Sequence, residues 1–161
     1  MTLAVALACS AGLLALAAVA VAIGRSTAAT RLVYGASTVI AAISLTAAAA
    51  HLAGVAEPAT LSLPLGLPWL GAHFRLDTLS AFFLLVIDLG ALSASLFALG
   101  YGEHEEAPER VLPFYPAFLA GMTLVVLADD AFTFLVSWEF MPSTVGINTS
   151  RTVAGTQISG S

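Results

Sequence analysis

Long apolar runs place the strongest limit on how this chain can fold. Residues 3–23 and 32–54 contain no charged side chain, and residues 78–99 contain a single one, Asp88. About twenty apolar residues are enough for an α-helix to cross the ~30 Å hydrocarbon core of a bilayer. The sequence therefore predicts an all-α integral membrane protein.

The composition agrees with this class of protein. Hydrophobic residues make up 59% of the 161 positions, charged residues make up 9%, and the mean hydropathy is +0.97. Soluble domains carry about a quarter charged residues. Ten acidic residues against five arginines give a formal charge of -5, which excludes the basic surface that nucleic-acid binding requires. We expect the lipid bilayer as a partner and no nucleic acid.

Two shorter apolar segments, 113–128 and 130–141, extend the predicted bundle to four or five transmembrane helices. Between the second and third helices, Pro58, Pro64 and Pro68 exclude a helix. Residues 61–67 alternate between leucine and small or polar residues, as short strands do. We therefore predict an external hairpin or loop between helices two and three.

Local signals refine the region around this hairpin. Asp77 and Thr78 are candidate N-caps of the third helix. Trp69 and Phe74 are predicted to anchor the hairpin at the membrane interface, where aromatic residues accumulate.

The arginines predict the orientation in the membrane. Arg25 and Arg31 flank the loop between the first two helices, and short positively charged loops stay in the cytoplasm. The N-terminus and the hairpin are then external, although Arg75 on the external side runs against the rule. A signal peptide is the alternative for residues 3–23, but no basic residue precedes them and they exceed the usual apolar length of about 7–15 residues.

Glu139 is the leading candidate for a functional residue. It lies nine residues after Asp130, or ~14 Å along a helix that rises ~1.5 Å per residue, close to the middle of the hydrocarbon layer. Carboxylates at such a depth by default mark ion or proton pathways. Burial disfavours their charged form and a nearby cation favours it. A purely structural hydrogen-bonding role for Glu139 stays open.

Asp88 is a second candidate, near the centre of the run 78–99. A role in proton movement and a plain hydrogen bond to a neighbouring helix are equally supported. Asp77 precedes Asp88 by eleven residues, which is close to three full turns of ~3.6 residues. The two carboxylates are therefore predicted to line one polar seam.

The chain offers no motif for a cofactor, a metal or catalysis. Cys9 is its only cysteine, which excludes an intramolecular disulfide or a metal centre built from cysteines of this chain. It contains no glycine-rich phosphate loop and no dinucleotide fingerprint. His51 is interpreted as an interfacial hydrogen-bonding residue, and His104 among four glutamates as part of a solvated charge run. We expect no cofactor, no metal and no catalytic site in this chain.

Residues 142–161 change the composition abruptly to serine, threonine and glycine. A helix of about eleven residues cannot finish crossing a bilayer in such a sequence. We expect a polar tail that is disordered or that results from a truncated or frame-shifted reading frame.

Three stretches together resemble a known family. They are FRLDTLS at 74–80, VVLADD at 125–130 and FLVSWEFM at 134–141. They are similar to the proton-pumping antiporter-like subunits of respiratory complex I, and most closely to component B of hydrogenase-4 and formate hydrogenlyase. The resemblance implies that Glu139 is the glutamate that pairs with a lysine on a later helix to move protons. It also implies that the redox cofactors belong to other subunits.

The resulting hypothesis is the N-terminal part of a proton-translocating subunit in a hydrogenase-4 or NADH dehydrogenase type complex of the cell (inner) membrane. Its partners would be other membrane subunits of that oxidoreductase complex. The family's lysines lie downstream of the matched region, and this chain contains no lysine. Two alternatives stay open, a small structural membrane subunit without transport activity and a fragment of a multi-subunit cation/proton antiporter.

Overall fold

The computed structural model describes residues 2–23, 27–54, 59–67, 70–101 and 112–139. The predictions for the acidic loop with His104, for Trp69 and for the tail 142–161 fall outside these residues. The described elements, in chain order, are α1 (Thr2–Ile23), α2 (Thr27–Leu52), β1 (Ala59–Leu67), β2 (Leu70–Leu76), α3 (Thr78–Tyr101) and α4 (Phe114–Leu127). A further helix occupies residues 131–139.

Three helices, α1, α2 and α3, are long and apolar enough to cross a membrane. They have 22, 26 and 24 residues. The other two described helices are shorter, with 14 residues in α4 and helix 131–139 after it. Length and composition therefore support three of the four to five predicted spans.

Helix α2 begins earlier than predicted, at Thr27 instead of residue 32. Arg31 accordingly lies within the helix. An arginine near a helix end is compatible with a membrane span because its long apolar stem can carry the charge to the interface.

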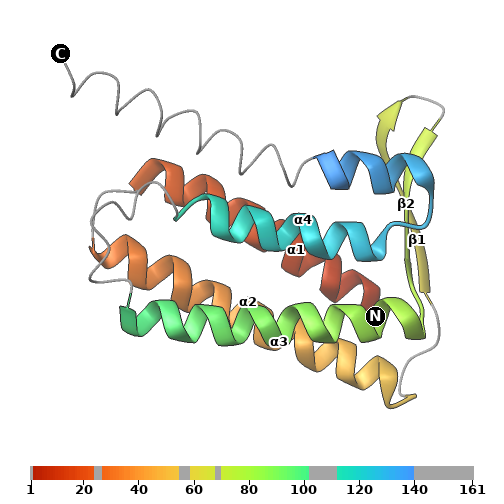
Figure 1. Cartoon of the computed structure of the whole chain (residues 1–161). Coiled ribbons are helices and arrows are strands. Elements are labelled where there is room, and N and C mark those ends of the chain that lie inside the picture. Colours follow the sequence, from red (N-terminus) through yellow and green to blue (C-terminus); the bar gives the residue numbers. More distant parts are fainter. Residues whose placement is uncertain (1, 24–26, 55–58, 68–69, 102–111, 140–161) are drawn as a thin grey trace.

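The four labelled helices pack side by side as a bundle (Figure 1). Helix α2 packs against α3. Helix α1 packs against both α2 and α4. Many of the buried positions are alanines, which let helices approach closely where no hydrophobic effect drives their association. They are Ala6, Ala17, Ala20, Ala29, Ala41, Ala48, Ala81, Ala91, Ala117 and Ala120.

The predicted hairpin is present as two antiparallel strands. Ala59 pairs with Leu76 and Leu63 pairs with Ala72, and the register becomes irregular before Leu67 pairs with Leu70. The hairpin lies at one end of the bundle (Figure 1). The side of the membrane on which it lies stays a prediction.

Phe74 corrects one of the sequence predictions. It is only 6% exposed and belongs to a core cluster with Leu76 of the hairpin and Leu3, Leu84 and Leu127 of three helices. It is therefore not an anchor at the membrane interface. The alternation of a strand explains the difference, because Phe74 and Leu76 share the face that packs on the bundle while Arg75 points to the other face.

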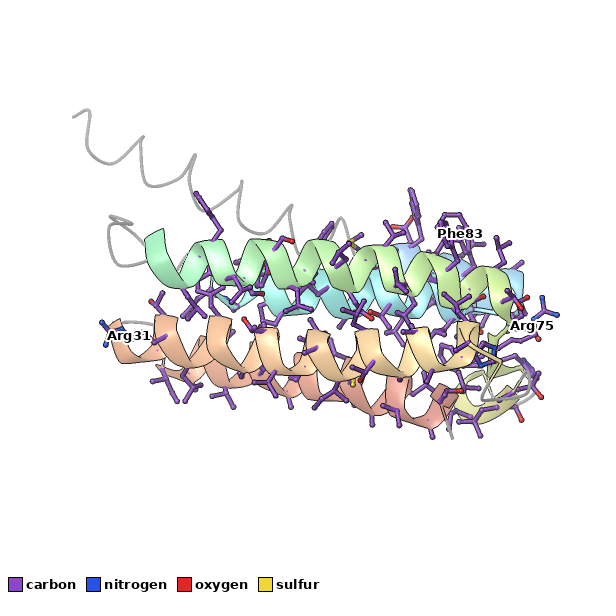
Figure 2. All side chains as sticks on the ribbon, turned by 90° about the horizontal axis from the view of Figure 1, so that it is seen from below. Arg31, Arg75 and Phe83 are labelled. Atoms are coloured by element: carbon purple, nitrogen blue, oxygen red, sulfur yellow. The ribbon has the colours of Figure 1, made fainter. Side chains whose placement is uncertain are left out.

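Two arginines lie at the ends of the bundle. Figure 2 shows Arg31 and Arg75 at opposite ends, with Phe83 projecting outward from the flank of α3. Helix α3 exposes a series of large apolar side chains, which are Leu79, Phe82, Phe83, Val86, Leu89, Leu96 and Phe97. Exposed apolar surface of this extent marks contact with a membrane or another protein, which fits a multi-pass membrane protein.

The packing of α3 predicts different costs for two leucines of the same helix. Leu84 is 1% exposed and Leu89 is 55% exposed. Leu84→Ala is expected to lower the free energy of unfolding by about 2 kcal/mol, because it leaves a cavity between packed helices. Leu89→Ala is the matched control and is expected to change it little. Unfolding in mixed detergent measures both, and equal costs would contradict the described packing.

Candidate functional site

Glu139 lies at the end of the described part of helix 131–139. This helix contacts the rest of the chain through a narrow stripe, because Thr133 and Ser137 are buried while Trp138 and Glu139 are exposed. Lipid or further helices must therefore cover the face that carries Glu139 if this helix lies in a membrane. The predicted depth of Glu139 in the bilayer stays a prediction.

Asp130 fixes the start of this helix. Its Oδ1 accepts a hydrogen bond from the backbone N–H of Thr133 at 2.8 Å, and its Oδ2 accepts one from the Thr133 hydroxyl at 2.6 Å. The backbone N–H of Phe134 donates to the carbonyl oxygen of Asp130 at 3.0 Å. This is the arrangement of an aspartate N-cap, which satisfies N–H groups that the first turn leaves without partners.

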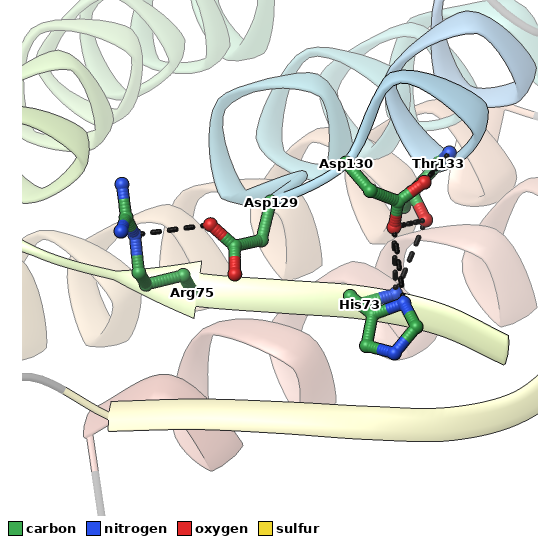
Figure 3. Close-up of polar contacts among 5 residues, drawn as sticks. All are labelled: His73, Arg75, Asp129, Asp130 and Thr133. Atoms are coloured by element: carbon green, nitrogen blue, oxygen red, sulfur yellow. Dashed lines mark hydrogen bonds and ion pairs between the residues drawn. The ribbon is translucent and has the colours of Figure 1, made fainter.

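The same carboxylate also holds the hairpin (Figure 3). The backbone N–H of His73 is shared between Asp130 Oδ2 at 3.2 Å and Thr133 Oγ1 at 3.1 Å. His73 Nδ1 lies 3.3 Å from Asp130 Oδ2. The backbone N–H of Asp129 donates in return to the His73 carbonyl at 2.9 Å, next to a β-bridge between Phe74 and Ala128. Strand β2 is thereby tied to the turn that precedes helix 131–139.

Arg75 adds two ion pairs to this junction. Its Nε lies 3.1 Å from Asp129 Oδ1 and its Nη2 lies 3.2 Å from Asp77 Oδ2. Figure 3 shows the pair with Asp129 beside the contacts of His73. Two carboxylates therefore balance the charge of Arg75 at this end of the bundle. We call His73, Arg75, Asp129, Asp130 and Thr133 the hairpin junction.

Two carboxylates at this end of the molecule, Asp77 and Asp130, have lowered pKa values. The Thr133 hydroxyl and N–H, followed by the His73 donors, lower the pKa of Asp130 to about 2. The backbone N–H of Ser80, at 2.8 Å, lowers the pKa of Asp77. That contact confirms Asp77 as the N-cap of α3. Hydrogen bonds to the charged form of a carboxylate favour that form, so both groups stay ionised at neutral pH.

Asp88 lies elsewhere, inside the bundle. It is 5% exposed and lines a small cavity together with Cys9, Ser44 and Thr123. Asp77 is engaged in its cap and with Arg75, whereas Asp88 faces the cavity. Glu139 is not among the residues that line this cavity. The two predicted site residues therefore belong to separate places in the described structure.

Two further sequence interpretations concern histidine and metal sites. His51 is buried, and its Nδ1 lies 3.4 Å from the hydroxyl of Thr2, in line with a hydrogen-bonding role. Within the described residues, no three His, Cys, Asp or Glu side chains come close enough to hold a metal ion.

Sequence reasoning missed the hairpin junction, although its parts carry a signal. Asp130 and Thr133 have the spacing of a helix cap, and His73 and Arg75 lie on the same face of a strand. Two of the three stretches that carry the family resemblance, 74–80 and 125–130, meet at this junction. The residues that carry the family resemblance in these two stretches therefore lie at the contact that fixes the start of the helix with Glu139.

Comparison with known proteins gives partial similarities. No family model matches the chain. An uncharacterised protein of Mycobacterium tuberculosis (strain H37Rv) is 35% identical over 75 residues, which cover 47% of this chain and 12% of that protein. Hydrogenase-4 component B of Escherichia coli (strain K12) is 39% identical over 69 residues, which cover 42% of this chain and 10% of that protein. The matched part of the chain thus spans about a tenth of the length of these relatives.

The hairpin junction predicts a specific response to the loss of Asp130. Asp130→Ala removes the cap of helix 131–139 and the acceptor of His73, so amide hydrogen exchange is expected to rise in both 131–136 and 70–76. Asp129→Ala is the matched control, because it removes only the ion pair with Arg75. Hydrogen–deuterium exchange with mass spectrometry measures both segments. Unchanged exchange in residues 70–76 of Asp130→Ala would contradict the described junction.

The lowered pKa of Asp130 predicts a pH window. The pKa falls from 3.8 to about 2 in the folded chain, so the contribution of Asp130 to stability is fully present above about pH 4 and is lost as the pH falls through 2. The ¹³Cγ resonance of Asp130, assigned by its disappearance in Asp130→Asn, is expected to titrate with a midpoint near pH 2. A midpoint at the ordinary value would show that the Thr133 and His73 donors do not hold the carboxylate.

Proposed function

We propose that this chain forms the N-terminal membrane region of a proton-translocating subunit in a hydrogenase-4 or NADH dehydrogenase type complex. The observation that supports this most directly is the 39% identity over 69 residues with hydrogenase-4 component B. The three helices that are long and apolar enough to span a membrane agree with it. In this proposal, redox chemistry in partner subunits drives proton movement across the cell membrane.

Glu139 is the proton-handling carboxylate of this proposal. The hairpin junction fixes the start of its helix through Asp130, so the height of Glu139 along the helix axis is set relative to the bundle. A carboxylate held at membrane depth binds and releases a proton according to the charges near it. Helix 131–139 is exposed on the face that carries Glu139, so another helix can pack against this face. Since this chain has no lysine, a lysine partner belongs to a segment or subunit beyond it.

The redox cofactors of this proposal belong to partner subunits. Iron–sulfur clusters are held by sets of cysteine thiolates, and Cys9 is the only cysteine of the chain. The chain contributes proton handling and membrane contacts. Its large exposed apolar face on α3 supplies surface for lipid or for a neighbouring subunit.

Glu139→Gln is expected to abolish proton pumping by the assembled complex in membrane vesicles, because the amide keeps the size of the side chain but cannot titrate. Assembly and electron transfer are expected to persist. Glu139→Asp, which keeps a titratable group on a shorter stem, is expected to retain part of the pumping. A pH-sensitive dye in the vesicle lumen measures the proton movement.

The outcomes of this experiment separate the candidate functions. Unchanged pumping in Glu139→Gln would remove Glu139 from the proton pathway. Purification of the complex through a tag on this chain identifies the assembly. Hydrogenase or dehydrogenase subunits support the proposal, cation/proton antiporter subunits favour that transporter class, and a complex that pumps equally without this chain favours a structural subunit.

A further inference from the structure

The side chain of His73 adds a contact to the hairpin junction that can change with pH. Its Nδ1 atom lies 3.3 Å from Oδ2 of Asp130 (Figure 3). The two side chains are 52% and 30% exposed, so the imidazole can exchange protons with the aqueous phase at the hairpin end of the bundle. Histidine is the side chain that changes its charge between about pH 5 and 8. The contact is therefore sensitive to the pH of that phase.

Protonation of His73 changes this contact in a defined direction. The neutral ring carries a proton on one of its two nitrogens, whereas the imidazolium carries a proton on each. Nδ1 of the imidazolium is therefore always a donor, and the ring then places a positive charge beside the Asp130 carboxylate. That carboxylate is ionised over the whole range in which histidine titrates, because hydrogen bonds from Thr133 and His73 lower its pKa to about 2. Proton uptake thus gives a charge-assisted hydrogen bond, which is stronger than a neutral one.

The other charged groups of the junction leave Asp130 to His73. Arg75, two residues along β2, pairs with Asp77 and Asp129, and β1 carries no titratable side chain. His51, at the hairpin end of α2, is buried and contacts Thr2. The remaining titratable groups of the helices around β2 lie farther along those helices from the hairpin end. They are Cys9, Asp88, Tyr101, Tyr115 and Glu139.

The backbone contacts of the junction are the same in both charge states of His73. The His73 N–H donates to Asp130 Oδ2 and Thr133 Oγ1, and the His73 carbonyl accepts from the N–H of Asp129. None of these donors titrates in the range of histidine. The imidazole therefore adjusts the strength of a junction that is present throughout this range.

Helix 131–139 is the element that responds to such an adjustment. Asp130 caps its first turn, whose N–H groups have no partner inside the helix. Among its described residues, Thr133 and Ser137 are the buried ones. Elements with few buried contacts open locally at a low free energy. A stronger hold on the Asp130 carboxylate therefore lowers the open population of this first turn.

We infer that His73 is a pH-sensitive latch, which tightens the hairpin junction when the aqueous phase at the hairpin end protonates it and loosens the hold of β2 on helix 131–139 when it loses that proton. The added stability is complete in acid and is lost as the pH rises through the range in which histidine titrates. The latch rests on the contacts of the junction alone and does not depend on proton transport by Glu139.

The exposure of the pair sets the size of the effect. An exposed ion pair changes a local equilibrium by up to about fivefold, because water and salt screen its charges. Ionic screening acts over about 3 Å at 1 M salt and over about 10 Å at 0.1 M. The effect of pH on the first turn is therefore expected to be roughly twofold to fivefold at low salt and smaller at high salt.

Hydrogen–deuterium exchange of the full chain in lipid nanodiscs tests the latch. The wild-type chain is labelled at about pH 5.5 and about pH 8, on either side of the titration of histidine, with labelling times scaled for the pH dependence of intrinsic exchange. Protection of residues 131–136 is expected to be roughly twofold to fivefold higher at the lower pH. About 1 M sodium chloride is expected to reduce this difference. Equal protection at both pH values, or a difference that salt leaves unchanged, would overturn the inference.

Two variants remove the charges and keep the hydrogen-bonding groups. His73→Gln retains a side-chain donor that does not titrate, and Asp130→Asn retains a capping oxygen without a charge. Each is expected to abolish the pH difference in residues 131–136. Ser62→Ala is the matched control, because Ser62 is exposed opposite His73 in the hairpin, and it is expected to keep the difference. A pH difference that survives in either charge-removing variant would overturn the latch, whatever Glu139→Gln does to pumping.

Discussion

The carboxylate of Asp130 connects two parts of the chain that lie 57 residues apart. It caps helix 131–139 through Thr133 and accepts the backbone N–H of His73 from β2. Because strand β2 itself is held by the burial of Phe74 and Leu76 against the ends of the helices, this one group relates the start of helix 131–139 to the packed bundle. The position of Glu139 along the axis of its helix is therefore set, relative to the bundle, by the hydrogen bonds of Asp130. A helix that touches its neighbours mainly through Thr133 and Ser137 would otherwise have little to fix its position.

Much of the architecture follows from patterns that are local in the sequence. The three long helices come from the length of their apolar runs, and the hairpin comes from its prolines and its alternation. Asp77 was identifiable as a cap because the acceptor and its N–H donor are three residues apart. The beginning of α2 could not be placed as well, because Arg31 directly precedes the apolar run 32–54 and so marks a boundary in the sequence, although its stem is compatible with a helix. Phe74 was misplaced because its burial depends on helices that are far away in the chain.

The two candidate carboxylates illustrate the same limit. Glu139 and Asp88 are both identifiable as acids within apolar stretches, and the structure separates them, with Glu139 on an exposed helix face and Asp88 buried beside a small cavity inside the bundle. The cavity itself was not predictable. Likewise, Arg75 and Asp129 look like unrelated loop charges until β2 is placed beside the turn.

Four buried polar residues of α2, Thr30, Ser37, Ser44 and His51, follow one another at a spacing of seven residues. A straight α-helix has 3.6 residues per turn, so positions seven apart drift around its axis by about 20° for each repeat. From Thr30 to His51 the series makes three such steps and rotates by about 60°. All four side chains are nevertheless buried. The face of α2 that other parts of the chain cover is therefore at least about 60° wide, so a substitution at any of these four positions meets another part of the chain and not lipid.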